Sequence, residues 1–137
     1  MAMLSHVGRV RARNEDFVFC DEVLGIAVLA DGMGGHAGGN VAARLAVDTW
    51  VGRIRKCLVE PLGERDLRVA VADANRVVFA AACADPALRR MGTTLVAACF
   101  RRDDTLLTCN VGDSRLYRLR GDVLSCLTRD HSVLRAQ

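Results

Sequence analysis

The residues best suited to chemistry lie in one short stretch, residues 28–39, where an apolar run ends in a carboxylate and a glycine-rich loop. Residues 24–30 are almost uninterrupted apolar sequence, which is typical of a strand buried on both faces. We therefore expect Asp31 to be delivered to the rim of a core with little freedom to move. Because the loop offers no Lys or Arg, a bound cation is the commonest remaining way to keep this carboxylate charged.

An arginine and three further acids extend this set of candidate residues: Arg11, Glu15, Asp16 and Asp113. Asp113 again follows an apolar run and a glycine, although Gly112-Asp113-Ser114 taken alone is typical of a turn. Carboxylates from several strand ends, together with water, form the oxygen-rich ligand set that Mg²⁺ or Mn²⁺ prefers. With Arg11 as a planar, bidentate phosphate ligand, these residues indicate metal-assisted hydrolysis of a phosphoryl group.

The glycine loop also fits a second interpretation, because Gly32-x-Gly34-x-x-Ala37 matches the dinucleotide-binding fingerprint. Three observations oppose it. Asp31 would repel the pyrophosphate, a second helical pattern follows where a paired strand is required, and no acid ends a second strand about 20 residues on. A nucleotide-binding module stays an alternative that the sequence does not favour.

The elements that must position these residues follow from hydrophobic periodicity. Residues 7–13 alternate so that Arg9, Arg11 and Arg13 would point the same way on a strand, and residues 17–20 and 24–30 are predicted strands. After the glycine loop the period changes to about three and a half residues, which predicts helices over about residues 40–58 and 67–82. The second helix ends near Asp85-Pro86.

The last third of the chain is rich in predicted strands, which cover residues 93–100, 105–111, 114–120 and 123–127. Gly121-Asp122 has the leading glycine of a tight hairpin turn. The order of two strands, two helices and four strands predicts an α+β fold in which the helices pack on an antiparallel sheet.

Composition narrows the class of protein further. With 137 residues, 51% of them hydrophobic and 26% charged, the chain has the make-up of one soluble globular domain. The net charge of +3 is small and spread out, so we expect no nucleic-acid or membrane partner. We also expect a monomer. The six cysteines form no C-x-x-C pair, and we interpret them as reduced core residues of a cytoplasmic protein. No secretory leader or membrane-spanning run is evident.

Four motifs resemble, in the correct order, those of the PP2C-type (PPM) protein serine/threonine phosphatases in their bacterial form: residues 8–16, residues 30–36, Met91-Gly92-Thr93-Thr94 and Gly112-Asp113-Ser114-Arg115. The resemblance covers the chain from Ser5 to Ser132. It implies an α-β-β-α sandwich of antiparallel sheets flanked by helices, of which residues 1–137 would form the N-terminal part. It also implies Mn²⁺ or Mg²⁺, two or more ions in the complete domain, and hydrolysis of phosphoserine and phosphothreonine in proteins by a metal-activated water.

The resemblance assigns the metal ligands as follows. Asp31 would bridge two ions, and Gly32 would contribute its carbonyl oxygen. Glu15 and Asp16 would coordinate directly or through water, while Asp113 resembles the ligand of a third, weaker ion. The partners implied are phosphoprotein substrates and a cognate serine/threonine kinase.

The resemblance also assigns residues that hold no metal. Arg11 would bind the substrate phosphate, while Thr93 and Thr94 look like packing residues near the site. The departing alkoxide needs a proton, and members from eukaryotes carry a histidine at the position of Met33. His36 is then the nearest candidate acid, although a histidine in a glycine loop also serves as a cap of the following helix.

Two histidines elsewhere have less defined roles. His6 stands where relatives often carry Asp, and His131 is expected in a loop. Family members continue past Asp130-His131-Ser132 to two later acidic motifs, which this sequence lacks. The chain is therefore expected to be a fragment of a phosphatase, or else a catalytically deficient phosphate-binding or interaction module of the same fold.

Overall fold

The computed structural model of the chain describes residues 1–34, 38–57 and 62–131. Within these residues the elements follow in the order β1 (Asp16–Asp21), β2 (Ile26–Met33), α1 (Gly38–Cys57), α2 (Glu64–Ala84), the 3-10 helix η1 (Pro86–Leu88), β3 (Gly92–Thr93), β4 (Leu95–Phe100), β5 (Leu106–Val111), β6 (Tyr117–Arg120) and β7 (Val123–Cys126). The α+β order expected from the sequence is therefore present.

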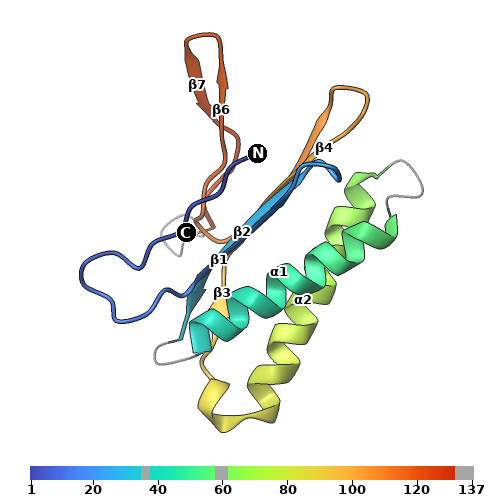
Figure 1. Cartoon of the computed structure of the whole chain (residues 1–137). Helices are drawn as coiled ribbons and strands as arrows, with labels where there is room; N and C mark the ends of the chain where they lie inside the picture. The colour runs from blue at the N-terminus through green and yellow to red at the C-terminus, as the bar shows by residue number, and fades with distance from the viewer. Residues whose placement is uncertain (35–37, 58–61, 132–137) are drawn as a thin grey trace.

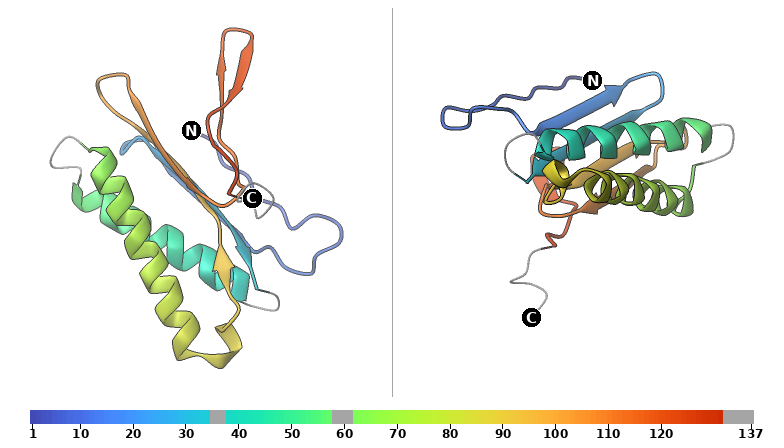
Figure 2. Two further views of the ribbon diagram at one scale, coloured as in Figure 1. Left: turned by 180° about the vertical axis from the view of Figure 1, so that it is seen from behind. Right: turned by 90° about the horizontal axis from the view of Figure 1, so that it is seen from below.

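Two sheets and one helical layer make up the described chain (Figure 1). The larger sheet has the strand order β1-β2-β4-β5, with β3 also paired to β2, and every pairing in it is antiparallel. Helices α1 and α2 lie side by side on one face of this sheet, while the β6-β7 hairpin and the N-terminal segment lie on the other side (Figures 1 and 2). The antiparallel pairing argues against a dinucleotide-binding βαβ unit, which requires parallel strands.

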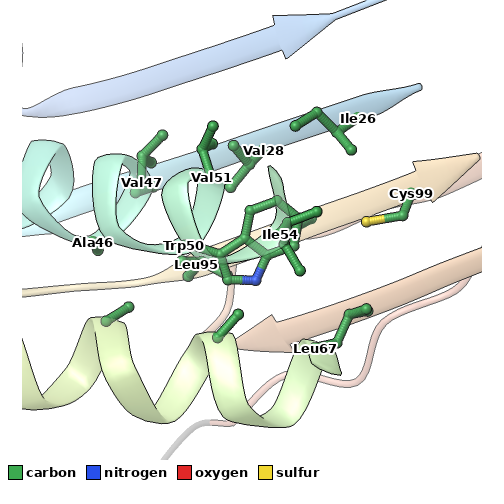
Figure 3. Close-up of a cluster of buried hydrophobic side chains, with 14 of the residues drawn as sticks. Ile26, Val28, Ala46, Val47, Trp50, Val51, Ile54, Leu67, Leu95 and Cys99 are labelled. Carbon is green, nitrogen blue, oxygen red and sulfur yellow. The ribbon is translucent and has the colours of Figure 1, made fainter. Parts of the chain in front are cut away.

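The core lies between the helices and the larger sheet (Figure 3). Trp50, Val47 and Ile54 form the buried stripe of α1, and Ile26 and Cys99 face it from β2 and β4. Fully burying one such side chain contributes about 1.5–3 kcal/mol. The apolar stripe that predicted the first helix is therefore also what fixes the helix on the sheet.

Strand β2 is the element that connects this core to the acids. Ile26, Val28 and Ala30 are buried toward the helices, so the period of two places Asp31 on the opposite face of the sheet, where it is exposed. The strand continues through Asp31 to Met33. The expectation that the strand ends at Asp31 is therefore wrong, because β3 continues the backbone pairing past it, at Gly32 and Met33.

Other element boundaries differ from the sequence prediction. Residues 7–13 form no strand, so Arg9, Arg11 and Arg13 do not point the same way along one. Residues 8–10 form a turn and residues 12–13 a bend, and Gly8 has a φ of 79°, which turns the chain. The predicted strand 93–100 is divided at Thr94, and the predicted strand 114–120 begins only at Tyr117.

The six cysteines are free thiols, as predicted, but they do not all belong to the core. Cys99 is buried, whereas Cys83 and Cys126 are exposed, which corrects the prediction for these two. Burial raises the pKa of Cys99 to about 12 and that of Cys109 to about 11, so both thiols stay protonated at neutral pH. No helix in the described ranges has the length and apolar character needed to cross a membrane.

Candidate functional site

Asp16 and Asp31 form the centre of the candidate site. They are direct partners in the antiparallel ladder between β1 and β2, so their side chains stand next to each other on the sheet face away from the helices. Partial desolvation raises the pKa of Asp31, and the charges of Asp16 and Asp113 raise it further, while Arg11 lowers it. Residues from three separate parts of the chain are thus brought within electrostatic range of Asp31.

The backbone of Asp31 is held by two threonines from the β3-β4 segment. Its N–H donates to Thr94 Oγ1 at 2.9 Å, and its carbonyl oxygen accepts the Thr94 N–H at 2.9 Å. The Thr93 hydroxyl donates to the same carbonyl oxygen at 3.0 Å. Because both polar groups of the peptide are satisfied, the position from which the Asp31 carboxylate projects is well determined.

Asp113 lies in a short loop that is held on both sides. Gly112 has a φ of 97°, a left-handed conformation that favours glycine, and its carbonyl oxygen accepts the N–H of His131 at 3.0 Å. On the other side, Ser114 Oγ lies 2.7 Å from Thr94 Oγ1. The Asp113 side chain itself is exposed, so the loop presents it to solvent next to Asp31.

Two hydrogen-bonded pairs extend the support of this loop. The Gly112 N–H donates to His131 Nδ1 at 3.4 Å, so the expectation that His131 lies in a loop is confirmed, and its contact with Gly112 is added to it. The Arg115 guanidinium donates twice to the carboxylate of Asp130, at 2.9 and 2.6 Å. This bidentate pair ties the segment after Asp113 to the irregular segment that follows the β6-β7 hairpin.

Glu15 faces the other side of the sheet from Asp16. Its carbonyl oxygen accepts the Gly32 N–H at 3.1 Å, and its carboxyl lies against Gly39, where an added Cβ would meet Glu15 Cδ at 2.8 Å. Gly32 and Gly39 are so close that a Cβ on Gly32 would overlap the Gly39 carbonyl oxygen. Glu15 therefore lies at the first turn of α1, and metal coordination by Glu15 and by the Gly32 carbonyl oxygen stays a prediction.

The remaining predicted site residues are only partly placed. Arg11 is exposed in the turn segment, and its charge lowers the pKa of Asp31, as expected of a cation beside the acids. His36 lies outside the described residues, so its role as a general acid stays a prediction. His6 makes a local contact, in which its Nδ1 accepts the Gly8 N–H at 2.9 Å.

The acids on the exposed face fit part of a divalent-cation site. Asp16, Asp31 and Asp113 offer only oxygen ligands, and a bound cation would remove the repulsion that raises the pKa of Asp31. In the part of the chain that the structure describes, however, no three His, Cys, Asp or Glu side chains converge closely enough to hold an ion by themselves. The fit is therefore to a partial ligand set.

The charged residues of this site are evident in the sequence, but the groups that support them are not. The resemblance indicates only a packing role for Thr94 and none for Ser114, although the two hydroxyls are in contact. The only available signal was the polar pair Thr93-Thr94 at the start of an otherwise buried strand.

A family model and a curated relative both relate this chain to protein phosphatases. The family model for Protein phosphatase 2C matches residues 6–134. The serine/threonine phosphatase Stp of Listeria innocua is 39% identical over 134 residues, which are 93% of this chain and 52% of the relative. The chain thus spans about half the length of this curated relative.

Solved structures agree with the sequence comparison. The crystal structure of the Mycobacterium tuberculosis serine/threonine phosphatase PstP/Ppp has a TM-score of 0.81 and 36% identity, over 94% of this chain and 53% of that one. The catalytic domain of PstP in complex with two manganese ions has a TM-score of 0.80 and 37% identity, over 94% and 54% of the two chains. The predicted fold class, antiparallel sheets with flanking helices, is confirmed over the half of those chains that this chain covers.

Proposed function

The chain belongs to the protein phosphatase 2C family, and on this basis we propose that it acts as the N-terminal part of a metal-dependent protein serine/threonine phosphatase. The proposed reaction is the hydrolysis of phosphoserine and phosphothreonine in proteins. We infer with it a cytoplasmic location, phosphoprotein substrates and a cognate serine/threonine kinase that produces them. Because the chain spans about half the length of its relatives, all of these are inferences from the family.

One observation within the chain supports the proposal more than any other, the cross-strand pair of Asp16 and Asp31 with Arg11 nearby. Two carboxylates opposite each other on an exposed sheet face repel, which is costly unless a cation lies between or beside them. A guanidinium close to the same acids adds a group that binds phosphate in a bidentate manner. Together they suit a substrate that brings negative charge to a bound cation.

The chain's own residues have separable roles in such a reaction. Asp16 and Asp31 would hold Mn²⁺, the ion present in the PstP complex, or Mg²⁺, and Asp113 would hold a further ion. Such ions, when bound, supply charge stabilisation for a phosphoryl group and activate water. Arg11 would orient the phosphate, while Thr93 and Thr94 keep the Asp31 backbone fixed.

The experiment is release of inorganic phosphate from a phosphothreonine peptide, with and without Mn²⁺, by a chain extended past Gln137 to the length of its relatives. We expect Mn²⁺-dependent release that falls at least about 100-fold in Asp31→Asn, because the variant loses a charged ligand of the ion. Asp122→Asn, in the hairpin turn remote from the site, is the matched control and should retain wild-type activity. Equal activity of Asp31→Asn and the wild type would overturn the proposal.

Two other outcomes would identify the alternatives. Mn²⁺-dependent binding of the phosphopeptide without any turnover would indicate a catalytically deficient phosphate-binding module of the same fold. A rise in melting temperature with NAD or ATP, but none with Mn²⁺ and the phosphopeptide, would indicate a nucleotide-binding module.

A further inference from the structure

Thr94 occupies an irregular position in the sheet, between the end of β3 at Thr93 and the start of β4 at Leu95. It contacts Asp31 twice, since its N–H donates to the Asp31 carbonyl oxygen and its Oγ1 accepts the Asp31 N–H, both at 2.9 Å. In a regular ladder a backbone carbonyl would accept that N–H. Here a side-chain hydroxyl takes the place of the carbonyl, so the Asp31 peptide depends on the identity of residue 94.

The same hydroxyl also contacts the loop that carries Asp113. Thr94 Oγ1 lies 2.7 Å from Ser114 Oγ, and Ser114 follows Asp113 directly. A hydroxyl has one hydrogen and two lone pairs, so Thr94 Oγ1 can accept from Asp31 and still form a full hydrogen bond with Ser114. Thr94 and Ser114 are 20 residues apart and Thr94 and Asp31 are 63 apart, so one oxygen joins three distant parts of the chain.

The methyl group of Thr94 makes a second, independent contact with the same loop. An added Cβ on Gly112 would lie 2.7 Å from Thr94 Cγ2, so the methyl group is packed directly on the Gly112 backbone. Gly112 must in any case be glycine-like, because its φ is 97°. Thr94 therefore touches the residues on both sides of Asp113, Gly112 through its methyl group and Ser114 through its hydroxyl.

We propose that Thr94 is a positioning residue, whose hydroxyl sets the placement of the Asp113 loop relative to Asp31 by linking the Asp31 N–H to Ser114. The inference rests on the proposed function in one respect, namely that Asp31 and Asp113 hold ions at a fixed separation. Ion sites tolerate small errors in ligand position poorly, so a residue that fixes two ligand-bearing segments at once affects ion affinity without touching the ion. Thr94 thus supports the site and is more than a packing residue.

Two substitutions at position 94 separate the hydroxyl from the methyl group. Thr94→Val keeps the shape and removes the hydrogen bonds, whereas Thr94→Ser keeps the hydroxyl and removes the methyl contact. Thr108→Val, an exposed position on the neighbouring strand β5, is the matched control. Ser114→Ala interrupts the link from its other end and leaves the Asp31–Thr94 pair intact.

The first measurement is amide hydrogen exchange and chemical shift in the ¹⁵N-labelled chain, which depends on no activity. Thr94→Val is expected to speed exchange at the Asp31 amide at least about tenfold and to shift the Asp113 and Ser114 signals. Ser114→Ala should shift the Asp113 signal and the Asp31 signal through Thr94. Thr94→Ser should stay close to wild type at all three amides, and Thr108→Val should change none of them.

The second measurement is the affinity for Mn²⁺ alone, by titration calorimetry. Thr94→Val should lose about 10- to 100-fold in affinity, as is usual when the support of a ligand is removed, and Thr94→Ser should restore most of it. Unchanged Asp113 and Ser114 signals in Thr94→Val would overturn the proposal, as would a Thr94→Ser variant that behaves like Thr94→Val. A wild-type chain that binds no Mn²⁺ would count against the proposed function, while the amide signals would still decide the role of Thr94.

Discussion

Asp16 and Asp31 stand opposite each other across strands β1 and β2, on the sheet face that the helices leave open. Opposed like charges on a sheet destabilise it, and nearby Asp113 adds a third negative charge, which Arg11 offsets only in part. The core residues Ile26, Val28 and Ala30 oppose a slip of the pairing by one residue, because such a slip would turn them away from the helices. The packing of the core thus forces the two carboxylates together.

Replacement of Asp31 by Asn is expected to stabilise the metal-free chain by about 0.2–1 kcal/mol, because it removes one of two opposed charges. The measurement is the free energy of unfolding by urea, in the presence of a chelator. Excess Mn²⁺ should stabilise the wild type by mass action and leave Asp31→Asn almost unaffected. Asp122→Asn, in the exposed β6-β7 turn, should show neither effect. A less stable Asp31→Asn variant in chelator would contradict the interpretation that these charges repel.

The metal-free chain should also lose stability as the pH rises through the range in which Asp31 ionises. Partial desolvation and the charge of Asp16 raise the folded-state pKa of Asp31 above its ordinary value of 3.8. The folded state therefore keeps a proton that the unfolded state has released, and the free energy of unfolding falls with rising pH. This loss begins near pH 3.8 and is complete above the raised pKa.

Other carboxylates titrate in the same range, so the measurement is the difference between the wild type and Asp31→Asn. In urea unfolding from about pH 3 to 7, the free energy of unfolding of Asp31→Asn should increase relative to that of the wild type as the pH increases. With saturating Mn²⁺ the order should reverse at neutral pH, because the ion binds the ionised carboxylate. A difference that stays constant with pH would mean that Asp31 titrates normally.

Gly32, which is in close contact with Gly39, and Gly52, which has open space around it, should respond in opposite ways to replacement by alanine. Gly32→Ala would place a Cβ onto the Gly39 carbonyl oxygen and onto the backbone of Glu15, so it should destabilise the chain by about 1–3 kcal/mol or more. Gly52→Ala, in the middle of α1 with open space around it, should stabilise the chain by about 0.5–1 kcal/mol. Thermal or urea unfolding of both variants tests the pair, and a Gly32→Ala variant as stable as the wild type would show that β2 and α1 separate readily at this contact.

The sequence predicted the elements whose position is decided by the core. The stripe containing Val47, Trp50 and Ile54 marks α1, and the apolar run from Ile26 marks β2, because the same side chains that create the pattern bury the element. Residues 7–13 show that alternation alone is insufficient. They alternate as a strand does, yet β1 pairs with β2 and leaves them as turns.

The candidate site was predictable to the extent that it consists of charges in unusual settings. Asp31 and Asp113 each follow an apolar run, which is a local signal. The partners that fix them are not local, since Thr94 contacts Ser114 and the Asp31 backbone only after the sheet has formed. No periodicity encodes such a contact, and for that reason Thr94 could be identified only from the three-dimensional structure.

Arg11 provides the last prediction, because it has two matched neighbours. Arg9, Arg11 and Arg13 are all exposed in the same segment before β1. Of these three arginines, only Arg11 contributes to the pKa shift of Asp31. If Arg11 binds the substrate phosphate, Arg11→Ala should weaken binding of inorganic phosphate to the Mn²⁺-loaded chain by about 10- to 100-fold, since a charge-assisted hydrogen bond contributes about 1.5–3 kcal/mol. Arg9→Ala and Arg13→Ala should change it by no more than about twofold. Equal losses in all three variants would mean that the segment attracts phosphate through its overall charge and that Arg11 has no specific role.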